Sequence, residues 1–345
     1  MLLVNTISET DAAPQAPIRT PKGWKRVGWQ GVTANTPDAW NLAAYGGDAR
    51  VGNIRIDNGE TAGNAVMGVE IRWSRPKKAL SAADLEKRLD QYLTSVDKGA
   101  KKQKLSADTK SKPLEDRRFP VRTARSFHWR VDRKGVGRIW HCAECGRLMI
   151  AQVVGAAKGD FQHLAHDVLA SLECHSADPA WRPWSLYDLH TEVPADFTLK
   201  GKPQLLNIYV QLAFERAGTT DLVTVEQWGV ASVQLRNAYL DEWFQEKNSA
   251  QESSLRYQSE ETTIHGHTAL AMTGRRWGLT YWGAQAIPQL TRLQLPAIHY
   301  AARIWECPET NKIFLIQSYT RRLDPTLVDR IVERTVCHPV PEEAS

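Results

Sequence analysis

An internal duplication constrains the fold of this chain more than any other feature. The segment 138–150 (RIWHCAECGRLMI) aligns with 303–315 (RIWECPETNKIFL), sharing Arg, Ile, Trp, Cys and Glu in register. Each segment is followed by apolar residues at helical spacing and then by a Cys-His pair, at 174–175 and 337–338. Because a repeated sequence indicates a repeated structural unit, we expect two similar domains.

The duplication divides the 345 residues into units that are each long enough to bury a core. We predict a flexible N-terminal segment at 1–19, a first repeat at 20–178, a second repeat at 183–340 and a short tail at 341–345. The connection near 178–184 (DPAWRPW) is rich in Pro and Trp, which predicts a short, stiff linker.

Within each repeat, predicted strands come in runs separated by turn signals such as Tyr45-Gly-Gly-Asp48. One amphipathic helix is expected in mid-repeat. In the first copy it begins at Ser81, three residues before Asp84, in a capping-box pattern; in the second copy the stripe runs through 235–244. This order predicts the α+β class, with a mainly antiparallel sheet and packed helices in each of two similar domains.

The order of elements resembles that of the Mog1/PsbP-like α/β/α sandwich, here in tandem. Both copies begin with a Pro-x-x-aromatic-x-Leu turn, at 37–42 (PDAWNL) and 194–199 (PADFTL). The resemblance covers both repeats, rests on element order, and assigns no functional residue. It implies a protein that acts by binding, as an accessory or assembly subunit.

Charge is distributed unevenly along the chain. The formal net charge is +5, yet residues 98–138 hold 14 Lys or Arg against four acids. Within this stretch we predict a basic insert at 98–118, and repeat two has no similar segment. A solvated loop is one interpretation, and binding of an acidic partner or a nucleic acid is another, with Phe119, Phe127, His128 and Trp129 as stacking groups. The candidate anion-binding or partner-binding residues are Lys101, Lys102, Lys104, Arg117, Arg118, Arg122, Arg125 and Arg130.

Four of the five cysteines are placed equivalently in the two repeats. Cys142 and Cys174 lie 32 residues apart, and Cys307 and Cys337 lie 30 apart, so we expect each pair to meet in space. Three interpretations stay open for these structural pairs: packed buried thiols, one disulfide in each domain, or zinc in repeat one alone.

The zinc interpretation uses Cys142, Cys145 and Cys174 with His175 or His141, because Cys142-Ala-Glu-Cys145-Gly has the shape of a zinc knuckle. In repeat two Thr310 stands where Cys145 would be. This argues against zinc in repeat one, because a hairpin that needs no metal in one copy need not bind one in the other. His265-Gly-His267 is open to two interpretations, a metal ligand pair or a turn that enters a strand.

Familiar catalytic motifs are absent from the sequence: there is no nucleophile elbow, no phosphate-binding glycine loop and no His-Glu-x-x-His. We therefore predict a non-catalytic structural or interaction protein, an accessory or assembly subunit that binds other proteins. We expect it to need no cofactor, with zinc left open as described above. The alternatives are nucleic-acid binding through 98–138 and a zinc-dependent enzyme. Among the 13 Trp, the interface candidates are Trp181, Trp184, Trp277 and Trp282.

The chain has no run of about 18 apolar residues. Its first residues, MLLVNTISETDAAP, have neither a basic n-region nor a long h-region. These features predict a cytoplasmic protein that does not insert into a membrane.

Overall fold

A computed structural model of the chain describes residues 20–59, 66–113, 124–206, 208–236, 238–252, 255–276 and 298–338. Repeat one contains, in order, β1 (Trp24–Trp29), β2 (Val32–Pro37), β3 (Asn41–Gly47), β4 (Val51–Asp57), β5 (Gly68–Ser74), α1 (Ala82–Lys102), β6 (Asp108–Pro113), β7 (Ala124–Arg130), β8 (Arg133–His141), β9 (Leu148–Ala156) and α2 (Gln162–Ala170).

Repeat two follows the same plan with small differences. It contains β10 (Trp181–Leu186), β11 (Leu189–Pro194), β12 (Phe197–Leu199), β13 (Gln204–Leu206), β14 (Tyr209–Arg216), β15 (Leu222–Gly229), α3 (Ala231–Leu235), α4 (Leu240–Glu252), β16 (Leu255–Ile264), β17 (His267–Arg276), β18 (Ile298–Cys307), β19 (Lys312–Thr320) and α5 (Leu327–Val332).

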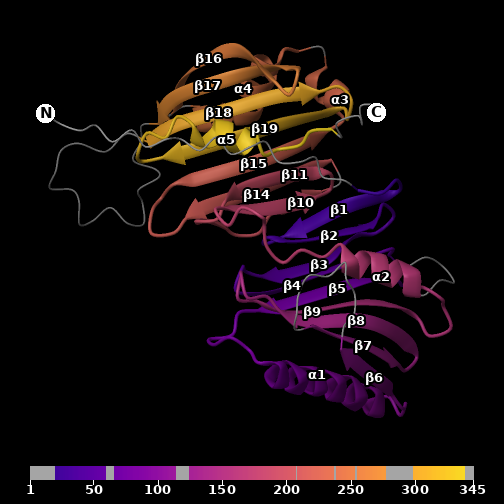
Figure 1. Cartoon of the computed structure of the whole chain (residues 1–345). Helices are drawn as coiled ribbons and strands as arrows, with labels where there is room; N and C mark the ends of the chain where they lie inside the picture. The colour runs from indigo at the N-terminus through magenta and orange to yellow at the C-terminus, as the bar shows by residue number, and fades with distance from the viewer. Residues whose placement is uncertain are drawn as a thin grey trace, which may run out of the picture.

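All strand pairs in the described chain are antiparallel, and they form three sheets. Repeat one has the order β3-β4-β5-β9-β8-β7-β6, and repeat two has β12-β14-β15-β19-β18-β17-β16 with β13 beside β14. The third sheet, β11-β10-β1-β2, combines the first hairpin of each repeat and lies between the two large sheets (Figure 1). Mostly antiparallel sheets with a few packed helices confirm the broad α+β class.

The shared sheet corrects the linker prediction, because Trp181 begins β10 and its strand pairs with β1 rather than acting as a spacer. Gly28 lies opposite Ser185 where the hairpins meet. A Cβ on Gly28 would come 2.9 Å from Thr33 Cγ2 and 3.1 Å from Ser185 Cβ, so the close approach of the two strands favours glycine there. The repeats therefore join through a backbone ladder.

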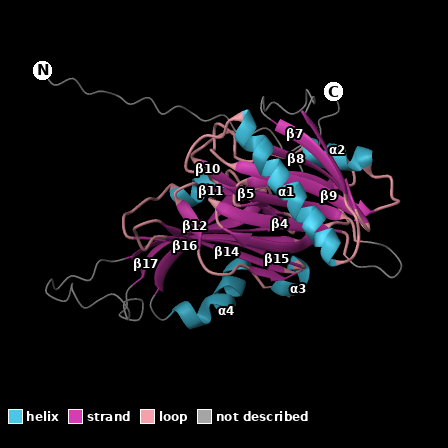
Figure 2. Ribbon diagram, turned by 90° about the horizontal axis from the view of Figure 1, so that it is seen from below, coloured by secondary structure: helices cyan, strands magenta, loops and turns pink. Residues whose placement is uncertain are grey.

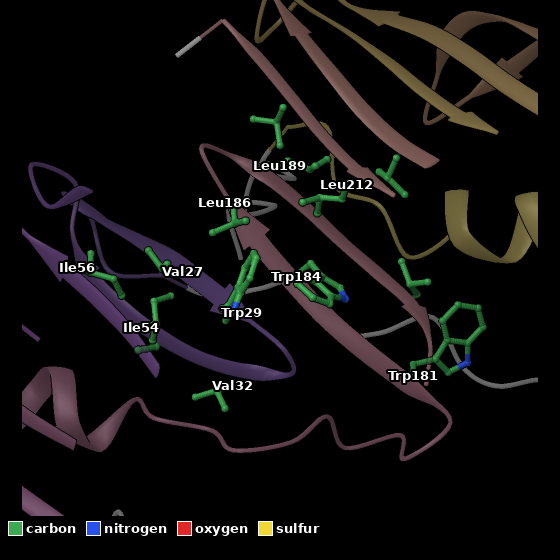
Figure 3. Packing of buried hydrophobic residues seen from close by; sticks show 14 of the residues in the cluster. Val27, Trp29, Val32, Ile54, Ile56, Trp181, Trp184, Leu186, Leu189 and Leu212 are labelled. Carbon is green, nitrogen blue, oxygen red and sulfur yellow. The ribbon is translucent and has the colours of Figure 1, made fainter. Parts of the chain in front are cut away.

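A continuous hydrophobic cluster extends from repeat one through the shared sheet into repeat two. Trp184 is 1 % exposed, and Figure 3 shows it beside Trp29. The centroid of the Trp184 ring lies 5.1 Å from that of Trp29 and 5.0 Å from that of Phe214. Trp181 is also buried. The proposal that these two tryptophans face a partner was wrong, because they pack in the core between the repeats; Trp277 and Trp282 lie outside the described residues.

Helix α1 crosses one face of the sheet of repeat one (Figure 2) and packs Leu85, Leu89 and Leu93 against it. Its capping box is as predicted: the Ser81 hydroxyl accepts from the Asp84 backbone, and the Asp84 carboxylate accepts from the Ser81 backbone. In repeat two the single helix predicted over 235–244 is wrong. Arg236 adopts φ +48, which ends α3 before α4 begins at Leu240.

Residues 98–113, the described part of the predicted insert at 98–118, contain regular structure. Their first part is the end of α1, and β6 follows as the edge strand paired with β7. Repeat two has counterparts in α4 and β16. Among the described helices none is both long enough and apolar enough to cross a membrane.

Candidate metal centres

Each repeat gathers four cysteine and histidine side chains at one point, between the last hairpin and the segment that follows the last helix. Site one consists of Cys142, Cys145, Cys174 and His175, and site two consists of His267, Cys307, Cys337 and His338. In each set the donor atoms all lie within 4.8 Å of one another. Every cysteine of the chain belongs to one of the two sites.

Local backbone bonds position the ligands of site one. Cys142 follows β8, its N–H donates to the Arg147 carbonyl at 2.9 Å, and its carbonyl accepts from Gly146 at 2.9 Å. Gly146 has φ +65, a left-handed conformation that glycine adopts without strain. After α2, Glu173 and Thr33 exchange two backbone bonds of 2.9 Å, which hold Cys174 against the shared sheet.

The same arrangement fixes site two. Cys307 ends β18, while Cys337 and His338 follow α5. Val336 donates to the His190 carbonyl at 2.9 Å, so β11 holds this segment as β2 holds its counterpart.

The donor separations match the edges of a small tetrahedron. With Zn–S of about 2.3 Å and Zn–N of about 2.0–2.1 Å, tetrahedral geometry requires edges of about 3.8 Å between sulfurs, about 3.6 Å between sulfur and nitrogen and about 3.3 Å between nitrogens. In site one Cys145 Sγ is 3.7 Å from Cys174 Sγ, and Cys142 Sγ is 3.6 Å from His175 Nδ1.

Site two has comparable dimensions. His338 Nδ1 lies 3.4 Å from Cys307 Sγ and 3.2 Å from Cys337 Sγ, and 3.2 Å from His267 Nε2. Both donor sets, Cys₃His and Cys₂His₂, are combinations that structural zinc sites use. The residues of both sites therefore fit a tetrahedral Zn²⁺ ion.

Carboxylates stand beside both sites. His175 Nε2 lies 2.6 Å from Glu144 Oε2, so the ring can donate to the carboxylate with Nε2 and keep Nδ1 for a metal. Glu309 occupies the same hairpin position in repeat two, with its carboxylate 3.4 Å from Cys307 Sγ. The Glu144 contact fixes the tautomer that coordination by His175 requires.

The surrounding charges differ as the two donor sets do. Three thiolates and a neutral histidine around Zn²⁺ carry a net charge of −1, whereas two thiolates and two histidines are neutral. Beside site one the buried Arg147 donates to the Cys174 carbonyl at 2.7 Å. The corresponding residue in repeat two, Lys312, forms an ion pair with Asp188, with 3.2 Å between Nζ and Oδ2. The buried Arg147 cation therefore lies beside the donor set that would carry a net negative charge with Zn²⁺ bound.

The thiols of site one differ in acidity. The hydrogen bond between Cys145 and Cys174 lowers the pKa of Cys145 to about 5 and raises the pKa of Cys174. Burial raises the pKa of Cys142. In site two burial raises the pKa of Cys337 to about 12. Without a metal, site one therefore favours one thiolate that shares a proton with its neighbour.

The cysteine pairs meet as predicted, and site one contains the predicted Cys142, Cys145, Cys174 and His175. His141, the other histidine considered, is not among the four. All five cysteines are free thiols in the structure. The sequence argument about metal considered only the hairpin of repeat two, where Thr310 bonds the Cys337 carbonyl at 3.1 Å, and so it did not anticipate that four potential ligands gather in this repeat.

The fourth donor of site two comes from the neighbouring strand instead. Ala269 pairs with Trp305, so two residues further along both strands His267 lies across from Cys307. The sequence feature that could have indicated this fourth donor is the motif His265-Gly-His267. Only His267 joins the cluster, while His265 Nε2 lies 3.1 Å from the Val332 carbonyl.

The predicted basic residues do not converge on one site. Lys101, Lys102 and Lys104 are exposed near the end of α1, and Arg130 is exposed on β7. Arg125 pairs with Glu86 at 3.0 Å, and Arg117, Arg118 and Arg122 lie outside the described residues.

Two of the aromatic residues proposed for stacking, Phe127 and Trp129, pack beneath α1 instead. Phe127 is 2 % exposed, and Trp129 donates to Gln152 at 2.9 Å beneath α1. Only His128 is exposed, and Phe119 lies outside the described residues. The described part of the basic segment therefore offers charge without an aromatic platform.

Comparison with known proteins adds no relatives: neither a protein-family model nor a curated protein matches this chain. The functional argument therefore depends on the geometry of the two sites.

Proposed function

We propose that this chain is a non-catalytic structural protein whose two repeats each hold one structural Zn²⁺ ion. The observation that carries the proposal is the pair of four-ligand clusters at equivalent places in a duplicated fold. Four side chains would fill the coordination sphere of each metal, and a closed sphere is typical of structural rather than catalytic zinc. This favours the structural role over the zinc-dependent enzyme.

In this proposal the metal adds coordinate bonds to apolar packing that already exists, since both cysteine pairs belong to the hydrophobic cluster. Each centre would link the last hairpin to the segment after the last helix, and that segment is bonded to the shared sheet. A metal in each repeat would thus stabilise the junction between them. The chain would then present a rigid pair of domains to other subunits, as an accessory or assembly protein of the Mog1/PsbP-like type.

Nucleic-acid binding is less well supported than this structural role. The described basic segment lacks an aromatic platform, and one of its arginines is paired with Glu86. Binding through it would be electrostatic, with an affinity that falls steeply as salt rises.

Metal content measured on the full chain tests the proposal. We expect two zinc ions per chain by plasma mass spectrometry, and one in either Cys145→Ser or His267→Gln. Thr310→Ser and His163→Gln are matched controls, because Thr310 bonds a carbonyl and His163 is exposed on α2. Both controls should retain two ions.

Cobalt substitution supplies a second readout. Co²⁺ in both sites should give the visible bands of tetrahedral coordination, and thiolate-to-cobalt charge transfer should fall more in Cys145→Ser than in His267→Gln. A chain that takes up no zinc when folded in its presence, or variants that lose no more metal than their controls, would overturn the proposal.

A further inference from the structure

Repeat two contains a cavity of about 590 Å³ on the face of its sheet that carries α5, away from the metal site. Its walls come from β16, β17, β18, β19 and the segment that leads into α5. The volume lies within the range of sites for small molecules, about 300–1,000 Å³.

The cavity exists because the repeats diverged at two facing positions. In repeat one Phe161 packs on β9, and a Cβ placed on Gly155 would come 2.7 Å from its ring. The alignment that superimposes the clusters places Asp324 at the position of Phe161 and Thr320 at that of Gly155. Repeat one thus has an aromatic ring packed on a glycine, whereas repeat two has two shorter polar side chains at these positions. The space that the ring fills in repeat one is left open in repeat two.

The cavity is cationic at its rim. Arg256 lies directly opposite Arg275 on the neighbouring strand, an arrangement of like charges that costs free energy unless an anion intervenes. Neither arginine has an ion-pair partner among the described residues. The acidic residue of the lining, Asp324, is already paired with Arg330 at 3.1 Å.

Hydroxyl groups form the floor. Ser318 and Thr320 line the cavity and are 2 % and 3 % exposed. Within the part of the chain that the structure describes, neither side-chain hydroxyl has a hydrogen-bond partner. Because both residues line the cavity, a ligand that enters it can exchange hydrogen bonds with the two hydroxyl groups in place of water. His299 and Gln258 add further polar groups to the wall.

We infer that this cavity binds a small hydroxylated oxyanion, a carboxylate or a phosphate ester. The guanidinium groups of Arg256 and Arg275 bind the oxyanion, since their planar donor pairs match its oxygens. Ser318 and Thr320 bond the hydroxylated body of the ligand. The site is independent of the metal centres, and repeat one cannot form it because Phe161 fills the space.

Calorimetric titration of the full zinc-loaded chain with glycerol 3-phosphate and with malate, at constant ionic strength, distinguishes the two classes of ligand. We expect one site per chain for one of the probes. Arg275→Gln should weaken that binding at least tenfold, whereas Arg130→Gln, at the corresponding strand position of repeat one, should leave it unchanged.

A second variant tests the cavity without removing charge from the rim. The double substitution Thr320→Gly with Asp324→Phe restores the pair found in repeat one, so it should abolish binding while the circular dichroism of the fold is retained. Binding that persists in this variant, binding equally weakened by Arg130→Gln, or no binding of either probe would overturn the inference. The zinc content of every variant is measured as well. If zinc is retained while ligand binding fails, the cavity inference is wrong and the proposed metal centres are unaffected.

Discussion

Replacing Arg147 with methionine tests whether its buried charge supports the first metal site. The side chain is 6 % exposed and donates to three backbone carbonyls: Gln30 at 2.8 Å, Cys174 at 2.7 Å and Ala49 at 3.0 Å. Hydrogen bonds to a charged group contribute about 1.5–3 kcal/mol each when buried, and somewhat less at the half-buried third bond. We therefore expect Arg147→Met to lower the free energy of unfolding by about 4 kcal/mol.

The assay is urea unfolding of the zinc-loaded chain, followed by both circular dichroism and tryptophan fluorescence. Competition with a chromophoric chelator measures the zinc affinity of each site in the same samples. Site one should bind zinc more weakly, because its net negative charge loses a neighbouring cation, and site two should be unaffected.

Lys312→Met is the matched control, since Lys312 occupies the corresponding position. Its contact with Asp188 involves a carboxylate side chain that is 67 % exposed, so the change should cost no more than about 1 kcal/mol. If the two variants unfold at the same urea concentration, or if Arg147→Met weakens both sites equally, the charge argument is refuted.

Two further predictions concern the shared sheet. Trp184→Ala should cost about 3–5 kcal/mol in urea unfolding, because it leaves a cavity between Trp29 and Phe214; a loss below about 1 kcal/mol would contradict its place in the core. Burial lowers the pKa of His190 from 6.5 to about 4, so the folded chain holds it neutral while the unfolded chain gains a proton as pH falls below about 6.5. Stability should therefore decline by at most about 3 kcal/mol between pH 6.5 and 4, and the urea midpoints of His190→Gln should show a smaller decline than the original chain.

Local patterns predicted much of each repeat. The capping box at Ser81 and Asp84 lies within four residues, and its prediction is correct because short-range hydrogen bonds determine it. The residues of the first candidate metal site were also predictable, since Cys142 and Cys145 lie in one hairpin and the Cys-His pair after the helix recurs in both copies.

Features that depend on distant pairing were not predictable in this way. The pairing of β1 with β10 joins residues about 157 apart in sequence, and nothing local distinguishes it from two separate hairpins. Because that ladder was missed, Trp181 and Trp184 were assigned to a surface. The break at Arg236 was missed for a different reason: the apolar spacing across it is helical, and only the left-handed backbone reveals it.

The two candidate metal sites show how a duplicated cluster can keep its geometry while one of the four side chains comes from a different element. Three ligand positions are common to the repeats, but the fourth comes from the hairpin in one and from the adjacent strand in the other. If the requirement is four donors at the corners of one tetrahedron, either source should suffice. We therefore predict that Thr310→Cys restores the zinc lost in His267→Gln, because residue 310 occupies the hairpin position of Cys145. The restored site should have three thiolates, seen as stronger cobalt charge transfer, and should release zinc more readily than site one, since Lys312 is directed to Asp188 and does not offset the added charge. A double variant that binds only one zinc ion would show that the strand position of the fourth ligand is itself required.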